Sequence, residues 1–408
     1  MDLRKYEDMF SAYIEQLGGI GAGPEGVFRA SYTDAYEEAV DQVAKWMTDH
    51  SLCVRKDSAG NLIGRIDGTG NNKSVIAMGS HLDTVRGGGL YDGALGVLGG
   101  VIAAGYLLKK YGRPKRPVEV IAFTGEEGSR FSGLLGSKWM AGFLGDQELR
   151  GKDANGVSAK EAAGKKGYDL GNEHDIPRKD IEAFIELHIE QGPVLEEKGI
   201  PIGVVSGITG IRQAEIRILG RKDHAGTTPM NMRKDALIAS VGLIRDMDSH
   251  VRRAGGNAVF TVGKIETRPG SINVVAEECT FTIDLRDPDS EKITRLNNDL
   301  ERMARETASR ADLQVDWHEI LTVEPVPCCP LLKEVLGEAA RSLGLKFLEI
   351  PSGAGHDALM IAKIAPIGMI FVPSRQGRSH CPEEYSSSCQ CVAGIAVLAE
   401  SIRRLAYE

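Results

Sequence analysis

The chain has 408 residues, of which 42% are hydrophobic and 26% are charged. These fractions are ordinary for a globular protein, and the length favours two domains over a single core. The net charge of −8 comes from interspersed acidic and basic residues, which leaves no basic stripe for nucleic acid. No stretch approaches the roughly 18 apolar residues of a membrane span and the first residues lack a signal-peptide pattern, so we expect a cytoplasmic protein.

Several common catalytic and structural patterns are missing from the sequence. The seven cysteines are an odd number without a CxxC pair, so a disulfide scaffold is not expected. The absence of HExxH, GxSxG and Walker A patterns disfavours zincins, serine α/β-hydrolases and P-loop enzymes. Residues that carry chemistry must therefore be sought outside these patterns.

The first half of the chain alternates short apolar runs with helical stretches. The runs at residues 74–80, 118–124 and 184–189 are typical of buried and largely parallel strands. The same style returns after residue 325, with a helix, another apolar run and a closing helix. The sequence therefore predicts an α/β domain, with a mixed, largely parallel sheet flanked by helices, made of residues 1–211 and 325–408.

The segment that begins at Arg212 has a different order of elements. Strand, helix, strand, strand, helix and strand follow one another, with the helices at about residues 233–253 and 290–311. This βαββαβ order is that of a ferredoxin-like unit. The sequence therefore predicts that residues 212–324 form a second domain inserted into the first.

Four apolar runs of the larger domain are followed by side chains of the kind that bind metals. The segments are GSHLDTV with Asp92 beyond it, FTGEEGS, ELHIEQG, and MIFVPS with the following SRQGRSHCPEE. In open α/β sheets, functional sites form outside the carboxyl ends of the strands. We therefore expect these four segments to converge in one cleft.

The expected ligand set contains three imidazoles and two carboxylates, namely His81, Asp92, Glu127, His188 and His380. This mixture suits zinc, manganese, cobalt or nickel. One ion needs fewer ligands, and a carboxylate has two oxygens, so Asp92 can bridge two divalent ions. One histidine and one further residue then complete each set, which predicts a two-metal centre.

Two acidic residues are expected to support this centre. Strand alternation places His81 and Asp83 on one side, where Asp83 can hold the free ring nitrogen of His81. The adjacent Glu126 and Glu127 point in different directions, so Glu127 can bind a metal while Glu126 acts as the general base on water. Taken singly, a strand histidine or a glutamate pair is usually structural or solvated. Taken together they favour a metal site, because buried unpaired charges are costly.

A series of motifs extends from about residue 60 to residue 385. The motifs are GSHLDTV, LYDGALGV, GEEGSRF, ELHIEQGPVLE, DHAGTTPMNMRKDA, INVV, TIDLRD, SGAGHDA and IFVPSRQGRSHCPEEY. Together they resemble the carbamoylase/allantoate amidohydrolase (hydantoinase/carbamoylase-type amidase) branch of the aminoacylase-like dinuclear metallohydrolases. ELHIEQG and HAGTTPM are specific to that branch rather than to the related peptidases. Thr124-Gly125, Ala276 and Cys381 depart from the usual pattern, but none is a predicted ligand, so they bear on substrate choice rather than on reaction class.

The resemblance implies a division of the ligands between the two metal ions. One ion would be held by Asp92, Glu127 and His380, and the other by His81, Asp92 and His188. The resemblance also implies Glu126 as the base, a zinc aminopeptidase-like catalytic domain, and a lid and dimerisation role for the inserted domain. A homodimer is therefore expected.

Residues outside the metal centre are also implied by the resemblance. His224 is expected to reach the active site of the partner subunit and to steady the developing oxyanion. Arg286 is expected to grip a substrate carboxylate bidentately. Without the resemblance, Arg286 is more simply a surface ion pair and His224 a loop residue that caps a turn. The other residues expected to bind substrate or line its pocket are Gln191, Asn273, Gly355 and His356.

The first functional hypothesis is hydrolysis of an N-carbamoyl-L-amino acid to the amino acid, carbon dioxide and ammonia. The second is allantoate amidohydrolase or another ureido or amidine hydrolase, because the same ligands and the same carboxylate grip serve both. A third, a catalytically silent protein that only binds the ligand, would require a missing metal ligand or a missing Glu126, and all are present.

Overall fold

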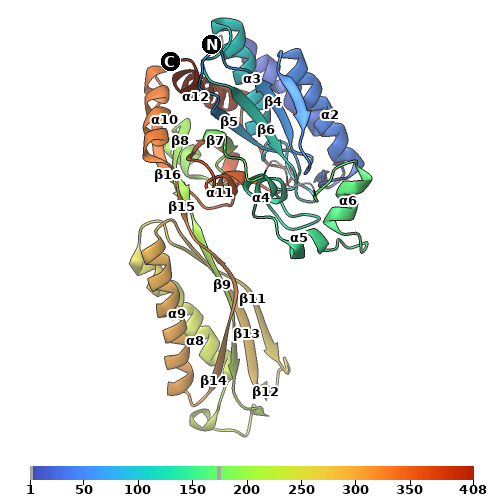
Figure 1. The fold of residues 1–408 in the computed structure, drawn as a ribbon. Helices are drawn as coiled ribbons and strands as arrows, with labels where there is room; N and C mark the ends of the chain where they lie inside the picture. Colours follow the sequence, from blue (N-terminus) through green and yellow to red (C-terminus); the bar gives the residue numbers. More distant parts are fainter. Residues whose placement is uncertain (1–2, 172–175) are drawn as a thin grey trace. The chain divides into compact units, whose positions relative to one another are not determined.

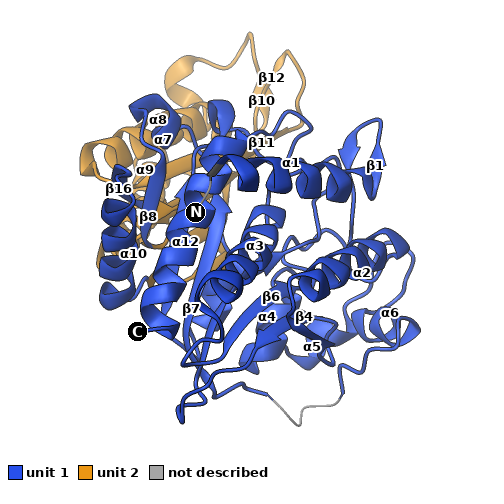
Figure 2. Cartoon of the chain, turned by 90° about the horizontal axis from the view of Figure 1, so that it is seen from above, with its two compact units in different colours: residues 1–206, 328–350, 354–408 blue, residues 207–327, 351–353 orange. Residues whose placement is uncertain are grey.

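The computed structural model describes residues 3–171 and 176–408, and the chain divides into two compact units. Unit 1 comprises Met1–Ser206, Cys328–Ile350 and Ala354–Glu408, and unit 2 comprises Gly207–Pro327 and Pro351–Gly353 (Figure 2). Within the described residues, no helix is both long and apolar enough to cross a membrane.

The sheet of unit 1 has a parallel centre and antiparallel margins (Figure 1). Neighbouring strands follow the order β8–β17–β7–β5–β6–β4–β3, and β16 pairs with β8. Strands β17, β7, β5 and β6 are mutually parallel, whereas β4, β3 and β8 pair antiparallel. The bounds are β3 Cys53–Lys56, β4 Leu62–Ile66, β5 Val75–His81, β6 Val118–Phe123, β7 Ile181–Ile189, β8 Ile202–Ile208, β16 Phe347–Ser352 and β17 Ile367–Val372. The predicted mixed, largely parallel sheet is thereby confirmed.

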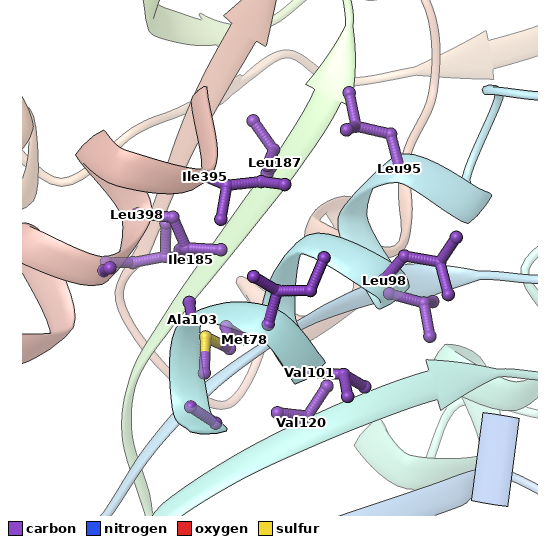
Figure 3. Close-up of a cluster of buried hydrophobic side chains, with 14 of the residues drawn as sticks. Met78, Leu95, Leu98, Val101, Ala103, Val120, Ile185, Leu187, Ile395 and Leu398 are labelled. Atoms are coloured by element: carbon purple, nitrogen blue, oxygen red, sulfur yellow. The ribbon is translucent and has the colours of Figure 1, made fainter. Parts of the chain in front are cut away.

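The central strands are buried on both faces, which explains their continuous apolar runs. Every residue of β5, β6 and β17 is buried. Alternation then separates two sets of side chains, because successive residues of a strand point to opposite faces. One set joins the main core (Figure 3) and includes Met78, Val120, Ile185 and Leu187. The other set includes His81 and His188, so the face opposite the main core carries these two predicted ligands.

Helices α3 (Ala94–Tyr111) and α12 (Ser388–Ala406) pack against each other and supply much of the main core. Helix α3 approaches β7 closely, since a Cβ at Gly96 would lie 2.3 Å from the carbonyl oxygen of Leu187. Only glycine permits this contact. The remaining longer helices of unit 1 are α1 (Leu3–Gly19), α2 (Asp34–Asp49) and α10 (Pro330–Ser342), while the shorter α4 (Leu135–Ala141) and α11 (Asp357–Ile361) contact β6 and β17, respectively.

Unit 2 has the predicted βαββαβ order of elements. Its antiparallel sheet follows the order β11–β13–β9–β14, and two helices complete its core. Asp235 and Asp289 cap these helices by accepting backbone N–H groups of the first turn. The compact unit starts at Gly207, near the end of β8, whereas the sequence predicted residue 212, and β9 begins at Gly210. The bounds are β9 Gly210–Leu219, α8 Ala236–Ala254, β11 Val259–Arg268, β13 Glu278–Asp287, α9 Ser290–Arg310 and β14 Gln314–Val323, with a small ladder of β10 Asp223–His224 and β12 Val274–Val275.

Candidate metal centre

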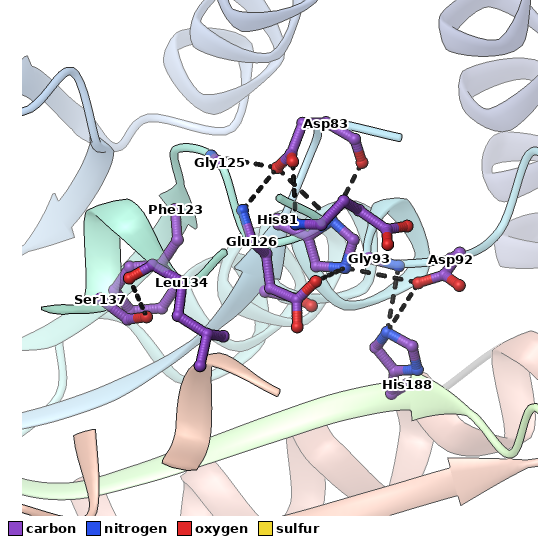
Figure 4. Close-up of polar contacts among 12 residues, drawn as sticks. His81, Asp83, Asp92, Gly93, Phe123, Gly125, Glu126, Leu134, Ser137 and His188 are labelled. Carbon is purple, nitrogen blue, oxygen red and sulfur yellow. Dashed lines mark hydrogen bonds and ion pairs between the residues drawn. The ribbon is translucent and has the colours of Figure 1, made fainter. Parts of the chain in front are cut away.

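The five predicted ligands meet at the carboxyl ends of the parallel strands. Figure 4 shows three of them, His81, Asp92 and His188. Each of the five comes from a strand end or from the loop that follows it. His81 ends β5, His188 lies near the end of β7, and Asp92 precedes α3. Glu127 follows β6 and His380 follows β17. Their ligand atoms form two groups that share Asp92, and within each group all ligand atoms lie within 4.8 Å of one another. A third group of the same kind joins His81 and Glu127 to Glu126.

The first group consists of His81, Asp92 and His188. The Oδ1 atom of Asp92 lies 3.4 Å from His81 Nε2 and 3.1 Å from His188 Nε2. Both imidazoles are buried, and their Nδ1 atoms lie 3.0 Å and 2.9 Å from the carbonyl oxygens of Asp83 and Ile189. Such contacts favour a proton on Nδ1, so Nε2 is the nitrogen that can bind an ion once it has released its own proton. The backbone N–H of Gly93 also points at His188 Nε2, at 3.2 Å.

The second group consists of Asp92, Glu127 and His380. His380 Nε2 lies 3.4 Å from Asp92 Oδ2 and 3.4 Å from Glu127 Oε2. The His380 side chain is 50% exposed, whereas that of Asp92 is 6% exposed. The two oxygens of Asp92 therefore face different groups, which is the arrangement of a bridging carboxylate.

The electrostatics of these residues fit divalent ions. Burial opposes ionisation of Asp92, but hydrogen bonds from three histidines outweigh it and hold its pKa well below the usual value. Burial opposes protonation of His81, but the charge of Glu126 and the bond to Asp92 raise its pKa well above normal. The hydrogen bond to Asp92 raises the pKa of His380 to about 9. The carboxylates of the centre thus favour positive charge at its histidine nitrogens. Either a proton or a metal ion can supply that charge, and the two compete for the same atoms.

Asp83 links the two glutamates to this centre. Its carboxylate accepts backbone N–H groups of Gly125 at 3.1 Å, Glu126 at 3.0 Å and Glu127 at 3.0 Å. The structure differs here from the expected contact with His81. The ring nitrogen of His81 lies 3.0 Å from the Asp83 carbonyl oxygen, while the carboxylate is 3.7 Å away. The turn after β5 directs the Asp83 carboxylate to the loop after β6. Asp83 therefore ties that turn to the loop that carries Glu126 and Glu127.

Glu126 lies beside the first ligand group, with Oε2 3.7 Å from His81 Nε2 and a side chain that is 12% exposed. Burial raises its pKa well above the usual value, and the charge of Asp357 acts in the same direction, while His81 opposes the shift. Burial also raises the pKa of Glu127, to about 7. A buried carboxylate with a raised pKa is suited to general acid–base chemistry.

The remaining residues of unit 1 that were expected to bind substrate have different surroundings. The Gln191 side-chain amide donates to Asp92 Oδ2 at 2.7 Å, and its backbone has a positive φ of 58°. A Cβ at Gly355 would meet nothing within 4 Å, so its backbone borders open space. His356 is 1% exposed, and its ring centroid lies 4.6 Å from that of His188 and 5.8 Å from that of Phe371. His356 therefore packs against other rings.

Unit 2 holds the other three predicted residues. The Nδ1 atom of the exposed His224 accepts the backbone N–H groups of Gly226 at 3.0 Å and Thr227 at 3.2 Å. Its proton therefore belongs on Nε2, which is free to donate. The strand ladder pairs His224 with Val274, the residue after Asn273. Arg286 makes a bidentate contact with Asp284 through Nε at 2.8 Å and Nη2 at 3.0 Å, and its Nη1 donates to the Gly353 carbonyl at 2.7 Å.

Sequence reasoning missed buried residues behind the ligands. Glu186 accepts the Ser80 hydroxyl at 2.7 Å and the Ala358 N–H at 2.9 Å. It stands two residues before His188 on β7, so strand alternation could have placed it on the ligand face. Glu384 and Ser379 bind the Asp92 loop from a segment almost 300 positions away, with a separation of 293 residues between Tyr91 and Glu384. No spacing rule connects such distant positions.

An α/β sheet that gathers imidazoles and carboxylates at the ends of its parallel strands is the arrangement of a metal-dependent hydrolase. Residues 77–404 match the family described as Peptidase family M20/M25/M40, and the chain belongs to that family. It is 40% identical over 396 residues to an N-carbamoyl-L-amino-acid amidohydrolase of Paenarthrobacter aurescens, with 96% of each chain covered. It is 39% identical over 395 residues to the allantoate amidohydrolase of Escherichia coli, again with 96% of each covered.

A solved structure shows the same fold. The amidase of the hydantoinase/carbamoylase family from Burkholderia multivorans superposes with a TM-score of 0.94 at 32% identity, and 98% of each chain is covered. The resemblance drawn from the motifs is thereby confirmed. The protein is an amidohydrolase of the M20 family, and it carries a candidate cluster for metal ions.

Proposed function

We propose that this protein hydrolyses a non-peptide C–N bond in a small carboxylated ureido substrate, an N-carbamoyl-L-amino acid. The products are the L-amino acid, carbon dioxide and ammonia. The observation that carries the proposal is the pair of ligand groups joined through the two oxygens of Asp92, in a chain 40% identical to an N-carbamoyl-L-amino-acid amidohydrolase.

The two groups would hold two divalent ions, one at His81, His188 and Asp92 and the other at Glu127, His380 and Asp92. Zinc, manganese, cobalt and nickel all suit this mixture of nitrogen and oxygen ligands. When bound, such ions polarise a carbonyl oxygen and lower the pKa of water toward neutrality.

Glu126 is the proposed general base. Its carboxylate lies at the edge of the first ligand group, where it takes a proton from the attacking water and later delivers it to the leaving nitrogen. Asp83 holds the backbone N–H of Glu126, so the carboxylate starts from a fixed position. No covalent enzyme intermediate is needed.

Arg286 is the proposed partner of the substrate carboxylate. A guanidinium has five N–H donors, and the contacts with Asp284 and Gly353 occupy one each on Nε, Nη1 and Nη2. One N–H remains on each terminal nitrogen and can donate to the substrate carboxylate. Gln191 and Asn273 are proposed to bind the rest of the substrate, with Gly355 and His356 bordering its pocket.

A homodimer through unit 2 is part of the proposal. The two edge strands of its sheet carry exposed apolar side chains, since Val259 is 57%, Ile265 47% and Ile320 53% exposed. Apolar edges of this kind favour pairing with another chain. In the dimer, the Nε2–H of His224 would serve the active site of the partner subunit by donating to the oxyanion.

Allantoate is the second candidate substrate, because allantoate amidohydrolases of Escherichia coli and Bacillus subtilis are 39% and 38% identical to this chain. Ammonia release from a panel of N-carbamoyl-L-amino acids and allantoate, measured with each candidate ion, decides between them. The proposal expects the highest kcat/KM on a carbamoyl amino acid. Activity that survives exhaustive chelation, or that persists in Glu126→Gln, would overturn it.

A further inference from the structure

Glu384 is a buried carboxylate that binds the loop in front of α3. It is 4% exposed, and its Oε1 accepts the backbone N–H groups of Tyr91 at 2.8 Å and Asp92 at 3.1 Å. The loop comes close enough that a Cβ at Gly89 would lie 2.3 Å from Oε1. The Glu384 carboxylate therefore fits here because residue 89 is glycine. It binds the backbone N–H of Asp92, the ligand shared by the two groups.

The second oxygen of Glu384 reaches the Asp92 side chain through a hydroxyl. Glu384 Oε2 lies 2.6 Å from Ser379 Oγ, and Ser379 Oγ lies 2.8 Å from Asp92 Oδ2. Glu384 thus accepts the backbone N–H of Asp92, and it shares with Asp92 Oδ2 the single O–H of Ser379, which donates to one of the two carboxylates at a time. An aspartate that is held at its backbone N–H and at one carboxylate oxygen has less freedom to rotate about its side-chain bonds.

The same contact spans the loop that carries His380. Ser379 and Glu384 flank this ligand, and their hydrogen bond closes the segment between them. The His380 backbone has a positive φ of 57°, which is uncommon for residues other than glycine and is adopted by histidine more often than by most of them. The first ligand group needs less support, because the buried rings of His81 and His188 contact carbonyl oxygens.

We propose that Glu384 is a positioning residue that orients Asp92 Oδ2 and the His380 loop, and thereby sets the affinity of the ion at Asp92, Glu127 and His380 more than that of the ion at His81, Asp92 and His188. This inference rests on the proposed two-ion centre. Partners of ligands commonly change metal affinity about 10–100-fold when they are removed.

The test is calorimetric titration of the full-length chain, freed of metal by chelation, with Mn²⁺ alone. The wild type is expected to bind two ions in two distinguishable steps. The step that is lost in His380→Ala belongs to the ion at Asp92, Glu127 and His380 and is called the second step. Glu384→Ala should weaken the second step about 10–100-fold and the first by a much smaller factor. Glu384→Gln should recover most of the loss, because its amide oxygen can still accept the N–H groups of Tyr91 and Asp92.

Two further variants separate positioning from general damage to the fold. Glu383→Ala is the matched control, since this adjacent glutamate pairs with exposed Arg378 at 3.1 Å and should change neither step. Ser379→Ala removes the hydroxyl link alone and should also weaken the second step selectively. Thermal melting of every variant identifies any that is destabilised.

Three outcomes would overturn the inference. They are equal weakening of both steps by Glu384→Ala, unchanged affinities in that variant, and an equal selective loss in Glu383→Ala. A wild type that binds two ions while Glu384→Ala shows no selective loss contradicts this inference alone. A wild type that binds no ion contradicts the two-ion centre itself, and the inference with it.

Discussion

Asp83→Asn tests whether one carboxylate organises the loop that holds Glu126 and Glu127. The wild-type carboxylate accepts three backbone N–H groups, two at Oδ1 and one at Oδ2. An asparagine has one carbonyl oxygen, which can keep the Gly125 and Glu126 contacts, while its NH₂ group then faces the N–H of Glu127. One charge-assisted hydrogen bond becomes a contact between two donors.

The expected cost follows from that single lost contact. A hydrogen bond to a charged group contributes about 1.5–3 kcal/mol to stability. This is less than the total free energy of unfolding of a typical domain, which is about 5–15 kcal/mol. The variant should therefore fold, with a lower melting temperature. Its kcat should fall at least about tenfold, because small displacements of catalytic groups cost up to about 100-fold. KM should change less.

Thermal melting and steady-state ammonia release measure the two effects. Asp67→Asn is the control, because this exposed carboxylate pairs with Arg65 at 2.8 Å, and exposed pairs contribute under about 1 kcal/mol. The reasoning is refuted if Asp83→Asn melts and turns over like the wild type. It is also refuted if the control loses as much activity.

Three more predictions concern the base, the ions and the substrate grip. Glu126→Gln should lower kcat about 10²–10⁴-fold while the metal content, measured by mass spectrometry, stays at the wild-type level. Metal affinity should rise with pH, since Glu127, with a pKa of about 7, and His380, with a pKa of about 9, must release protons before binding. Titrations from pH 6 to 9 check this sign, and a flat profile contradicts it. Arg286→Lys should raise KM for a carboxylated substrate more than it lowers kcat, because lysine cannot make a bidentate contact. Initial-rate kinetics would contradict that role if KM were unchanged.

The convergence of the five ligands could be predicted because it depends on topology. His81, Glu127 and His188 each stand at or just beyond the end of an apolar run, and parallel strands end at one edge of a sheet. The βαββαβ order of unit 2 was equally readable, since its strands alternate buried and partly exposed residues. Periodicity and strand direction carry this information locally.

Contacts set by loop conformation could not be predicted in the same way. In the turn after β5, the ring of His81 contacts the carbonyl oxygen of Asp83, while the Asp83 carboxylate binds the loop after β6. Gln191 and His380 have positive φ values that no local sequence pattern predicts. Glu384 resembles its exposed neighbour Glu383 in the sequence, and only the folded loop separates their roles.

The central claim is that Asp92 is shared by two ions, and counting ions in single-ligand variants tests it most directly. The chain, loaded with Mn²⁺ and freed of excess metal, should contain two ions in the wild type and one each in His188→Ala and His380→Ala. Asp92→Ala should retain none. Two ions in Asp92→Ala, or one in the wild type, would contradict the shared carboxylate.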